Sequence, residues 1–381
     1  MIPMPNRPLA LAKSACAAIF LIAILSGCSS TADKPKPAEL GPISALVGVR
    51  QAWSNRVGEV GYALQVQAAE NTVAVAASDG TVALIDADTG RDLWRTSAGG
   101  RLAAGVGNDG KTVALVTAAN EVVALSAGKE LWRQKLTAQV YTAPLVAGAR
   151  VFVLGADRSV SAFDGQTGRR LWTQQRPGEP LVLQQAGVLL AVGDTLVAAL
   201  SGRLVGLNPL GGAVRWEASL ASPRGTNDVE RLVDLVSPVS RLGDVVCVRA
   251  FQASVGCVNT ARGATVWTKP SSGSVGVHGD DRWVYSAESD GKVVAWRRDN
   301  GERAWTSDKL LHRGLTAPLS AGRSVVVGDS AGFVHLLSRE DGSLVNRLTT
   351  DGSAVAAAPV LAGRTLVVVT RNGGVFGYLP E

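Results

Sequence analysis

The chain has 381 residues and a formal net charge of +6, and only 18% of its residues are charged. The basic residues are scattered along the chain and do not form a stripe, so the charge pattern argues against a nucleic-acid partner. The 43 glycines indicate a fold with many turns, because glycine is the residue that most readily adopts a positive φ.

The N-terminal segment 1–27 has the layout of an export signal. Arg7 and Lys13 precede an apolar run over 15–25, which is shorter than the ~20 residues that a membrane-spanning helix needs. The run ends at Leu25-Ser26-Gly27-Cys28, which resembles the lipobox of bacterial lipoproteins. We therefore predict a lipoprotein signal peptide over 1–27 and lipid attachment to the Cys28 thiol. The alternative is a soluble exported protein in which this cysteine has no such role.

Residues 28–42 are predicted to form the lipidated cysteine and a flexible tether. The segment is rich in proline and charge and nearly free of large apolar residues. Ser29 follows the cysteine, whereas an Asp at that position favours retention in the inner membrane in lipoproteins of this class. By this resemblance, we expect lipid anchoring in the outer membrane, with the folded body facing the periplasm.

One phrase recurs through the rest of the chain: a polar turn, a short apolar strand, a second turn ending in glycine, and a strand ending in tryptophan. It is clearest over 79–94, 157–172 and 290–305, and weaker copies end at Trp132, Trp216 and Trp267. From Trp53 to Trp305 these tryptophans are 42 residues apart on average, so residues 43–381 accommodate eight units. A period of about 40 residues with several short strands per unit is typical of a β-propeller.

We therefore predict an all-β fold over 43–381, an eight-bladed β-propeller of four-stranded antiparallel blades. The second strand of each unit is almost continuously apolar, as over 113–116 and 151–154, which suits a strand buried between neighbouring blades. The last unit stops one strand short, and an unassigned strand around Trp53 precedes the first unit. We expect this N-terminal strand to join the C-terminal blade and close the ring. The repeated tryptophans are expected to pack between neighbouring blades.

Four cysteines are present, and two of them belong to the propeller. Cys16 lies in the predicted signal peptide and Cys28 is the predicted anchor. Cys247 and Cys257 lie in two strands on either side of a short turn, so a hairpin would place them opposite each other. The periplasm is oxidising, which permits a cross-strand disulfide, and two buried free thiols are the alternative.

The repeat is interrupted at two places. The interval from Trp172 to Trp216 contains residues 176–185 ahead of its first regular strand. The interval from Trp216 to Trp267 is 51 residues long, with its excess between 219 and 238. Both segments place apolar residues where a polar loop would be enough. They either pack against the ring or form a protein-binding patch, since insertions in repeat proteins are often functional loops.

The sequence contains few motifs that are typical of catalysis. His278, His312 and His335 lie in different units and lack the spacing of metal ligands. Neither a phosphate-binding loop nor a nucleophile elbow occurs, and carboxylates concentrate in turns such as those at Asp86 and Asp164, where they cap backbone groups. We therefore predict no enzymatic activity, no cofactor and no metal.

The repeat resembles that of the pyrroloquinoline-quinone dehydrogenases, which are also eight-bladed. Those enzymes are usually much longer and carry adjacent cysteines in a disulfide and a catalytic Asp near calcium. This chain has no adjacent cysteines and little beyond the ring itself. A lipobox followed by a bare eight-bladed ring is more similar to the BamB family, and the stretches 230–234, 310–318 and 326–335 support that resemblance. It implies a non-enzymatic scaffold of the outer-membrane β-barrel assembly (BAM) complex. Such a scaffold binds the POTRA domains of BamA and helps outer-membrane proteins to fold and insert.

The resemblance also implies a contact surface on the two interruptions. Leu181 and Leu183 match paired leucines of the family, and Gln184 stands where an Arg commonly follows. In the second segment, which includes Arg231, Asp234 matches the first of two acids, and Val236 replaces the second. A BamA contact built on these residues should be more apolar, and its affinity less sensitive to salt, than a contact with the Arg and the two acids of the family.

Three further readings stay open. Blade edges could add strands to unfolded outer-membrane clients, as proposed for the family. A periplasmic propeller that binds polysaccharide is an alternative to the scaffold, as is a relative of the quinone dehydrogenases.

Overall fold

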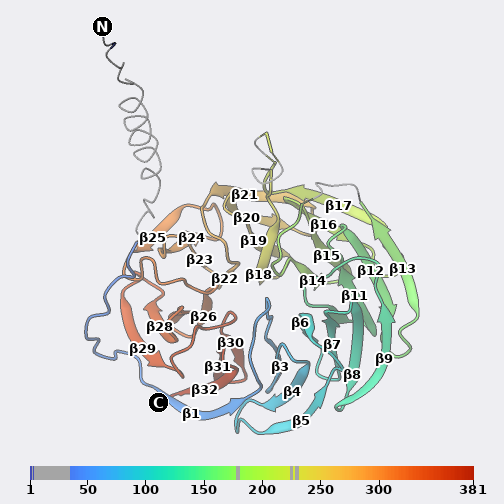
Figure 1. Ribbon diagram of the computed structural model, residues 1–381, viewed down its shortest axis with the longest axis horizontal. Helices are drawn as coiled ribbons and strands as arrows, with labels where there is room; N and C mark the ends of the chain where they lie inside the picture. Colours follow the sequence, from blue (N-terminus) through green and yellow to red (C-terminus); the bar gives the residue numbers. More distant parts are fainter. Residues whose placement is uncertain (2, 4–34, 177–180, 224–225, 228–230) are drawn as a thin grey trace. The chain divides into compact units, whose positions relative to one another are not determined.

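The computed structural model describes residues 1, 3, 35–176, 181–223, 226–227 and 231–381. The chain divides into two compact units, 1–36 and 37–381. The second unit is a β-propeller in which eight four-stranded antiparallel sheets surround a channel, as predicted (Figure 1). The predicted signal peptide and Cys28 lie outside the described residues. Within the described ranges, no helix has the length and apolar character needed to cross a membrane.

Each blade runs from an innermost strand at the channel to an outermost strand at the rim. Blades 1 to 4 consist of β2 (Gln67–Ala69), β3 (Thr72–Ala76), β4 (Thr81–Asp86) and β5 (Asp92–Ser97); β6 (Leu102–Asn108), β7 (Thr112–Thr117), β8 (Glu121–Ser126) and β9 (Lys129–Lys135); β10 (Leu145–Ala147), β11 (Arg150–Leu154), β12 (Ser159–Asp164) and β13 (Arg170–Gln175); β14 (Leu189–Val192), β15 (Thr195–Leu200), β16 (Arg203–Leu207) and β17 (Val214–Ser219). Blades 5 to 8 consist of β18 (Leu235–Leu242), β19 (Val245–Ala250), β20 (Ser254–Asn259) and β21 (Ala264–Pro270); β22 (Val277–Gly279), β23 (Trp283–Ala287), β24 (Val293–Arg297) and β25 (Arg303–Ser307); β26 (Leu319–Ala321), β27 (Ser324–Gly328), β28 (Phe333–Ser338) and β29 (Leu344–Thr349); β30 (Val360–Ala362), β31 (Thr365–Val369), β32 (Gly374–Pro380) and β1 (Val49–Arg56).

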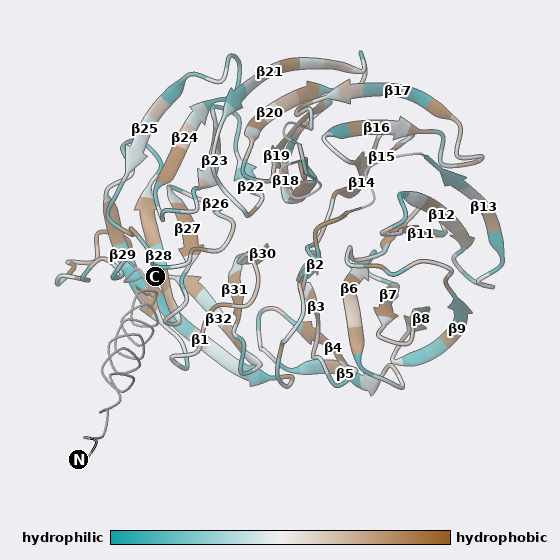
Figure 2. Ribbon diagram, turned by 45° about the horizontal axis from the view of Figure 1, so that its top comes forward, coloured by the Kyte–Doolittle hydropathy of each residue, from teal (hydrophilic) through white to brown (hydrophobic). Residues whose placement is uncertain are grey.

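The apolar strands predicted from the sequence are the second and third strands of the blades. All six residues of β7 are buried, whereas β9 at the rim of the same blade is largely exposed. Figure 2 shows the same gradient, with hydrophilic residues gathered on outermost strands such as β9 and β13. The middle strands lose water on both faces because a neighbouring blade covers each face, which requires apolar side chains at successive positions.

The ring is closed by the N-terminal strand, as predicted. β1 pairs antiparallel with β32, from Val49 opposite Pro380 to Arg56 opposite Gly374. The last blade therefore gains its fourth strand from the other end of the propeller. This closure removes the open edge that three strands alone would leave.

The repeated tryptophans pack between blades, as predicted, and each meets a glycine of the next blade. These glycines have φ between 62° and 75°, and a β-carbon on any of them would lie 3.3 Å or less from a tryptophan atom. The seven pairs are Trp53–Gly90, Trp94–Gly128, Trp132–Gly168, Trp172–Gly212, Trp216–Gly263, Trp267–Gly301 and Trp305–Gly342. The glycine and the tryptophan of the repeated phrase thus form the contact between neighbouring blades.

The segment ahead of β1 runs along blade 7. The Ala38 amide donates to the Leu311 carbonyl (2.9 Å), and the Asn346 amide side chain donates to the Val47 carbonyl (2.7 Å). From Ala38 onward, the predicted tether is therefore hydrogen-bonded to the propeller. Residues 28–34 of the predicted tether lie outside the described residues.

Candidate functional site

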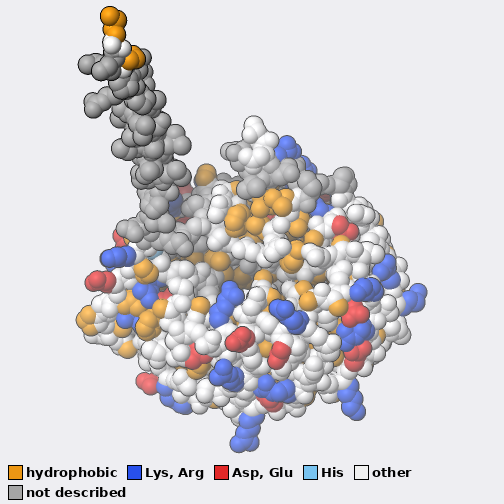
Figure 3. Space-filling model, viewed as in Figure 1, with side chains coloured by type: hydrophobic (Ala, Val, Ile, Leu, Met, Phe, Trp, Pro, Cys, Tyr) orange, Lys and Arg blue, Asp and Glu red, His pale blue; other side chains and the backbone are white. Residues whose placement is uncertain are grey.

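The two predicted interruptions lie on either side of blade 4. The first connects β13 to β14 and the second connects β17 to β18, and the hydrogen bond from the Leu183 amide to Asp234 Oδ2 (2.9 Å) brings them together. Residues 177–180, 224–225 and 228–230 of these segments lie outside the described residues. Hydrophobic side chains gather on the face shown in Figure 3, in the region where Figure 1 places β18.

The structure separates the predicted contact residues into exposed and supporting groups. Leu181 is 39% exposed and Gln184 is also exposed, whereas Leu183 and Arg231 are half-buried. Asp234 is half-buried too, and its carboxylate is engaged within the chain. Leu181 and Gln184 are therefore the predicted contact residues that are most accessible to a partner.

Val236 does not belong to this surface. It lies in β18 and is 2% exposed, so its side chain packs in the core beneath the segment. The surface therefore gains no exposed apolar side chain from Val236.

Arg158, which is not among the predicted contact residues, lies below this surface. Its guanidinium donates to Asp234 Oδ1 (2.9 Å) and to the Leu181 carbonyl (3.1 Å). A signal was present in the repeat, because the phrases at 79–94 and 290–305 have glycine at the position that Arg158 occupies.

The channel beside this surface has a volume of about 1110 Å³. Its wall comes mainly from 61–68, 314–320 and 354–361, which are rich in small apolar residues, and Gln184 and Gln185 reach it from the first interruption. Among the described residues, no group of three or more His, Cys, Asp or Glu side chains is placed to hold a metal ion.

Cys247 and Cys257 are paired directly across β19 and β20. The structure joins their sulfur atoms in a disulfide, and both residues are fully buried. This bond lies inside blade 5, so we interpret it as part of the blade core.

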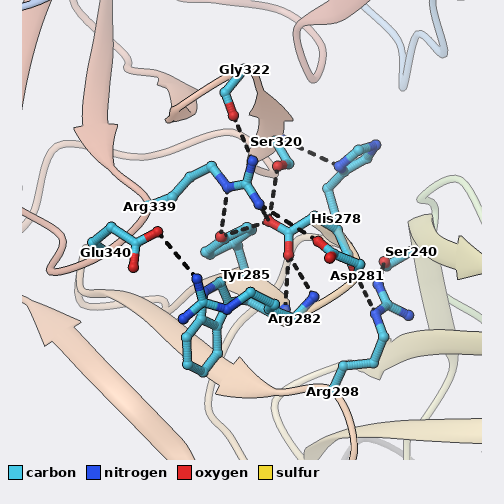
Figure 4. Close-up of polar contacts among 12 residues, drawn as sticks. Ser240, His278, Asp281, Arg282, Tyr285, Arg298, Ser320, Gly322, Arg339 and Glu340 are labelled. Carbon is cyan, nitrogen blue, oxygen red and sulfur yellow. Dashed lines mark hydrogen bonds and ion pairs between the residues drawn. The ribbon is translucent and has the colours of Figure 1, made fainter.

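Acidic and basic side chains also gather at a second place, between blades 5, 6 and 7 (Figure 4). Asp280 accepts hydrogen bonds from the Tyr285 hydroxyl (2.8 Å) and pairs with the Arg339 guanidinium (2.7 Å). Arg298 donates to Ser240 and contacts the Cys247 sulfur (3.5 Å), both in blade 5. These bonds join three adjacent blades.

His278 belongs to the same cluster. Its Nδ1 accepts a hydrogen bond from the Ser320 amide of blade 7 (3.1 Å). Burial lowers the pKa of His278 to about 4, and the nearby Arg298 acts in the same direction, so the imidazole is neutral at neutral pH. Asp280 is thus held by Tyr285 and Arg339, and His278 is held by the Ser320 amide, so we interpret the cluster as a support for the blade interfaces.

Comparison with known proteins decides between the families that share this fold. The chain matches the family described as "Outer membrane protein assembly factor BamB" over residues 78–307. It is 40% identical over 375 residues to the BamB of Burkholderia pseudomallei (strain K96243), which covers 97% of this chain and 98% of the relative. The chain belongs to the BamB family. A BamB of Bordetella pertussis is 38% identical, with 92% of each chain covered, and that of Escherichia coli (strain K12) is 26% identical, with 94% and 96% covered.

Solved structures agree on the fold. The BamB of Moraxella catarrhalis matches with a TM-score of 0.79 at 22% identity, covering 87% of this chain and 99% of the other. A quinohemoprotein alcohol dehydrogenase from Comamonas testosteroni matches with a TM-score of 0.67 at 15% identity, covering 88% and 78%. The ring is therefore common to the BamB family and to these enzymes. Sequence similarity over nearly the whole chain identifies it as an outer membrane protein assembly factor.

Proposed function

We propose that this chain is a non-enzymatic scaffold of the BAM complex that binds the POTRA domains of BamA and assists the folding and insertion of outer-membrane proteins. Its lipidated Cys28 holds it to the outer membrane, with the propeller facing the periplasm. Membership in the BamB family supports the assembly role, and the sequence before the propeller supports the anchor.

One observation carries the choice of surface. Leu181 exposes 39% of its area, although its own carbonyl accepts a hydrogen bond from Arg158 and the nearby Leu183 amide donates one to Asp234. Apolar side chains that are exposed on a fixed backbone suit a partner contact, because binding buries them at little cost in conformational freedom. BamA would meet Leu181, Leu183 and Gln184, with Arg231 at the second segment.

The test is co-purification with BamA from solubilised outer membrane. The variant Leu181→Ala with Leu183→Ala is expected to lose BamA while keeping its melting temperature. Leu210→Ala with Leu242→Ala is the matched control, because these leucines are 67% and 47% exposed, but Leu210 lies in the turn between β16 and β17 and Leu242 lies at the end of β18. Retention of BamA by the first variant would overturn the assignment of the surface.

A further inference from the structure

The turn between the second and third strands contains a residue with positive φ in every blade. In blade 3 this residue is Arg158, with φ of 65°. The others are Gly80, Asn120, Ser201, Gln252, Gly291, Gly332 and Gly373. A residue with a β-carbon pays a conformational penalty here that glycine avoids, and arginine has no special tolerance for this region as Asn does.

The turn itself does not need the arginine side chain. Asp157 Oδ1 accepts a hydrogen bond from the Ser159 amide (3.0 Å), as Asp79 Oδ1 does from the Thr81 amide (2.8 Å) in blade 1. The blade 1 turn makes this bond with glycine in the middle. The reason for arginine at 158 must therefore lie in the contacts of its side chain.

The Arg158 side chain connects three separate parts of the chain. It lies in blade 3, it pairs with Asp234 of the second interruption (2.9 Å), and it donates to the Leu181 carbonyl of the first (3.1 Å). The second oxygen of Asp234 accepts the Leu183 amide (2.9 Å). The Leu181 carbonyl and the Leu183 amide are thus both held by one ion pair.

This ion pair is shielded from water. Its side chains are only 9% and 15% exposed, so a partner that docks on the surface has little access to either charge. Charge-assisted hydrogen bonds of this kind are short and directional, and they fix the backbone that they bind. The Leu183 amide also occupies the second carboxylate oxygen of Asp234, which an approaching cation would otherwise contact.

We propose that Arg158 and Asp234 form a clamp that positions the backbone of 181–183 and so presents Leu181 and Leu183 to BamA. The inference rests on the proposed docking role of these leucines. Asp234 then acts by positioning the segment and does not contact the partner through its charge. The clamp lowers the conformational cost of binding, because the segment is ordered before BamA arrives.

The experiment compares Arg158→Gly, Asp234→Asn and the double variant in the full-length protein. Arg158→Gly removes the guanidinium and gives the turn the residue that its φ favours. Hydrogen exchange of the peptide covering 181–186 reports on the clamp without BamA, and titration with purified POTRA domains reports on docking. Melting temperature identifies any variant that fails to fold.

The clamp predicts that each single variant increases amide exchange of this peptide and weakens POTRA binding by about tenfold, with little further loss in the double variant, because both changes remove one shared interaction. Arg158→Lys is expected to show exchange and binding between those of the parent protein and Arg158→Gly, since a lysine keeps the charge but lacks the planar guanidinium that reaches two acceptors. Gln252→Gly is the matched control: it changes the equivalent turn of blade 5, where the glutamine is exposed, and should alter neither measurement.

Three results would overturn the proposal, and each contradicts a different part of it. Unchanged exchange at 181–186 in Arg158→Gly would mean that there is no clamp. Weaker binding in Asp234→Asn but not in Arg158→Gly would make Asp234 a direct contact. Suppose that the Leu181→Ala, Leu183→Ala variant loses BamA. If Arg158→Gly then increases amide exchange but does not weaken POTRA binding, docking does not need the clamp. If the leucine variant keeps BamA, the assignment of the docking surface fails, and the exchange measurement still decides whether the clamp exists.

Discussion

Trp132 of blade 2 packs against Gly168 of blade 3 so closely that a β-carbon on the glycine would lie 2.6 Å from Cδ2 of the indole. The indole Nε1 also donates to the Gly165 carbonyl of the same turn (2.9 Å). This contact combines a buried ring, a hydrogen bond and a turn with φ of 70°. It explains why the glycine and the tryptophan recur together along the chain.

Gly168→Ala is therefore expected to lower the free energy of unfolding by about 2–4 kcal/mol, because the new methyl group collides with the ring and the turn has positive φ. Urea denaturation measures this loss. Gly148→Ala is the control: its φ is 56°, but nothing lies within 4 Å of the added carbon, so about 1 kcal/mol is expected. Equal losses in the two variants would contradict the role assigned to the blade-to-blade contact.

His278 predicts a dependence of stability on pH. Its pKa is about 4 in the folded protein, against 6.5 as the ordinary value, so the unfolded chain binds the proton more readily between these two pH values. The stability from the neutral imidazole is thus fully present above pH 6.5 and is lost as the pH falls toward 4. The loss is on the order of 3 kcal/mol.

His278→Asn should flatten this part of the stability curve, since an amide oxygen can accept the Ser320 amide without titrating. Thermal melts at intervals between pH 7 and pH 4 make the comparison. An identical slope in the variant and the parent would rule out His278 as the titrating group.

Arg249 and Glu288 form a buried ion pair between blades 5 and 6, with side chains 0% and 9% exposed and 2.9 Å between Nη2 and Oε1. Removing the cation alone, in Arg249→Met, leaves a buried carboxylate without its partner and should cost about 3–5 kcal/mol. Replacing both residues by apolar ones, in Arg249→Met with Glu288→Leu, should recover much of the lost free energy of unfolding. Chemical denaturation of the two variants tests this order, and a double variant that is less stable than the single one would contradict it.

The pair Cys247–Cys257 predicts the outcome of a thiol titration. In the protein unfolded without reductant, neither of these cysteines should react with a thiol reagent, and reduction should release two thiols. Cys247→Ala with Cys257→Ala should lower stability by about 2–3 kcal/mol, from the freedom that the unfolded chain regains. Two reactive thiols before reduction would establish the alternative of buried free cysteines.

The Arg158–Asp234 pair predicts how salt affects the proposed BamA contact. Because the Asp234 carboxylate is already neutralised within the chain, the affinity for POTRA domains should change less than about tenfold between roughly 0.05 and 0.5 M salt. Binding measured by titration at several salt concentrations makes the test. A steeper fall would indicate that exposed charges carry the contact.

The sequence by itself determined the propeller. The apolar second strands and the turn glycines are short-range features that recur from unit to unit, and seven of the eight units carry the rim tryptophan, so eight blades could be counted directly. The closure by β1 followed as well, because the last unit lacked a strand and the N-terminus supplied one. The positions of the two interruptions were equally visible, since they break a regular period.

Only the tertiary structure decided what those interruptions do to each other. Arg158 and Asp234 are 76 residues apart, and the hydrogen bond from Arg298 to Ser240 spans 58. Such contacts depend on how neighbouring blades are placed, and the repeat carries no information about them. For the same reason the sequence could not tell that Val236 is buried while Leu181 is exposed, since both are apolar residues within the two interruptions of the repeat. The period specifies the ring, whereas burial and ion pairing between blades specify which side chains remain free to meet a partner.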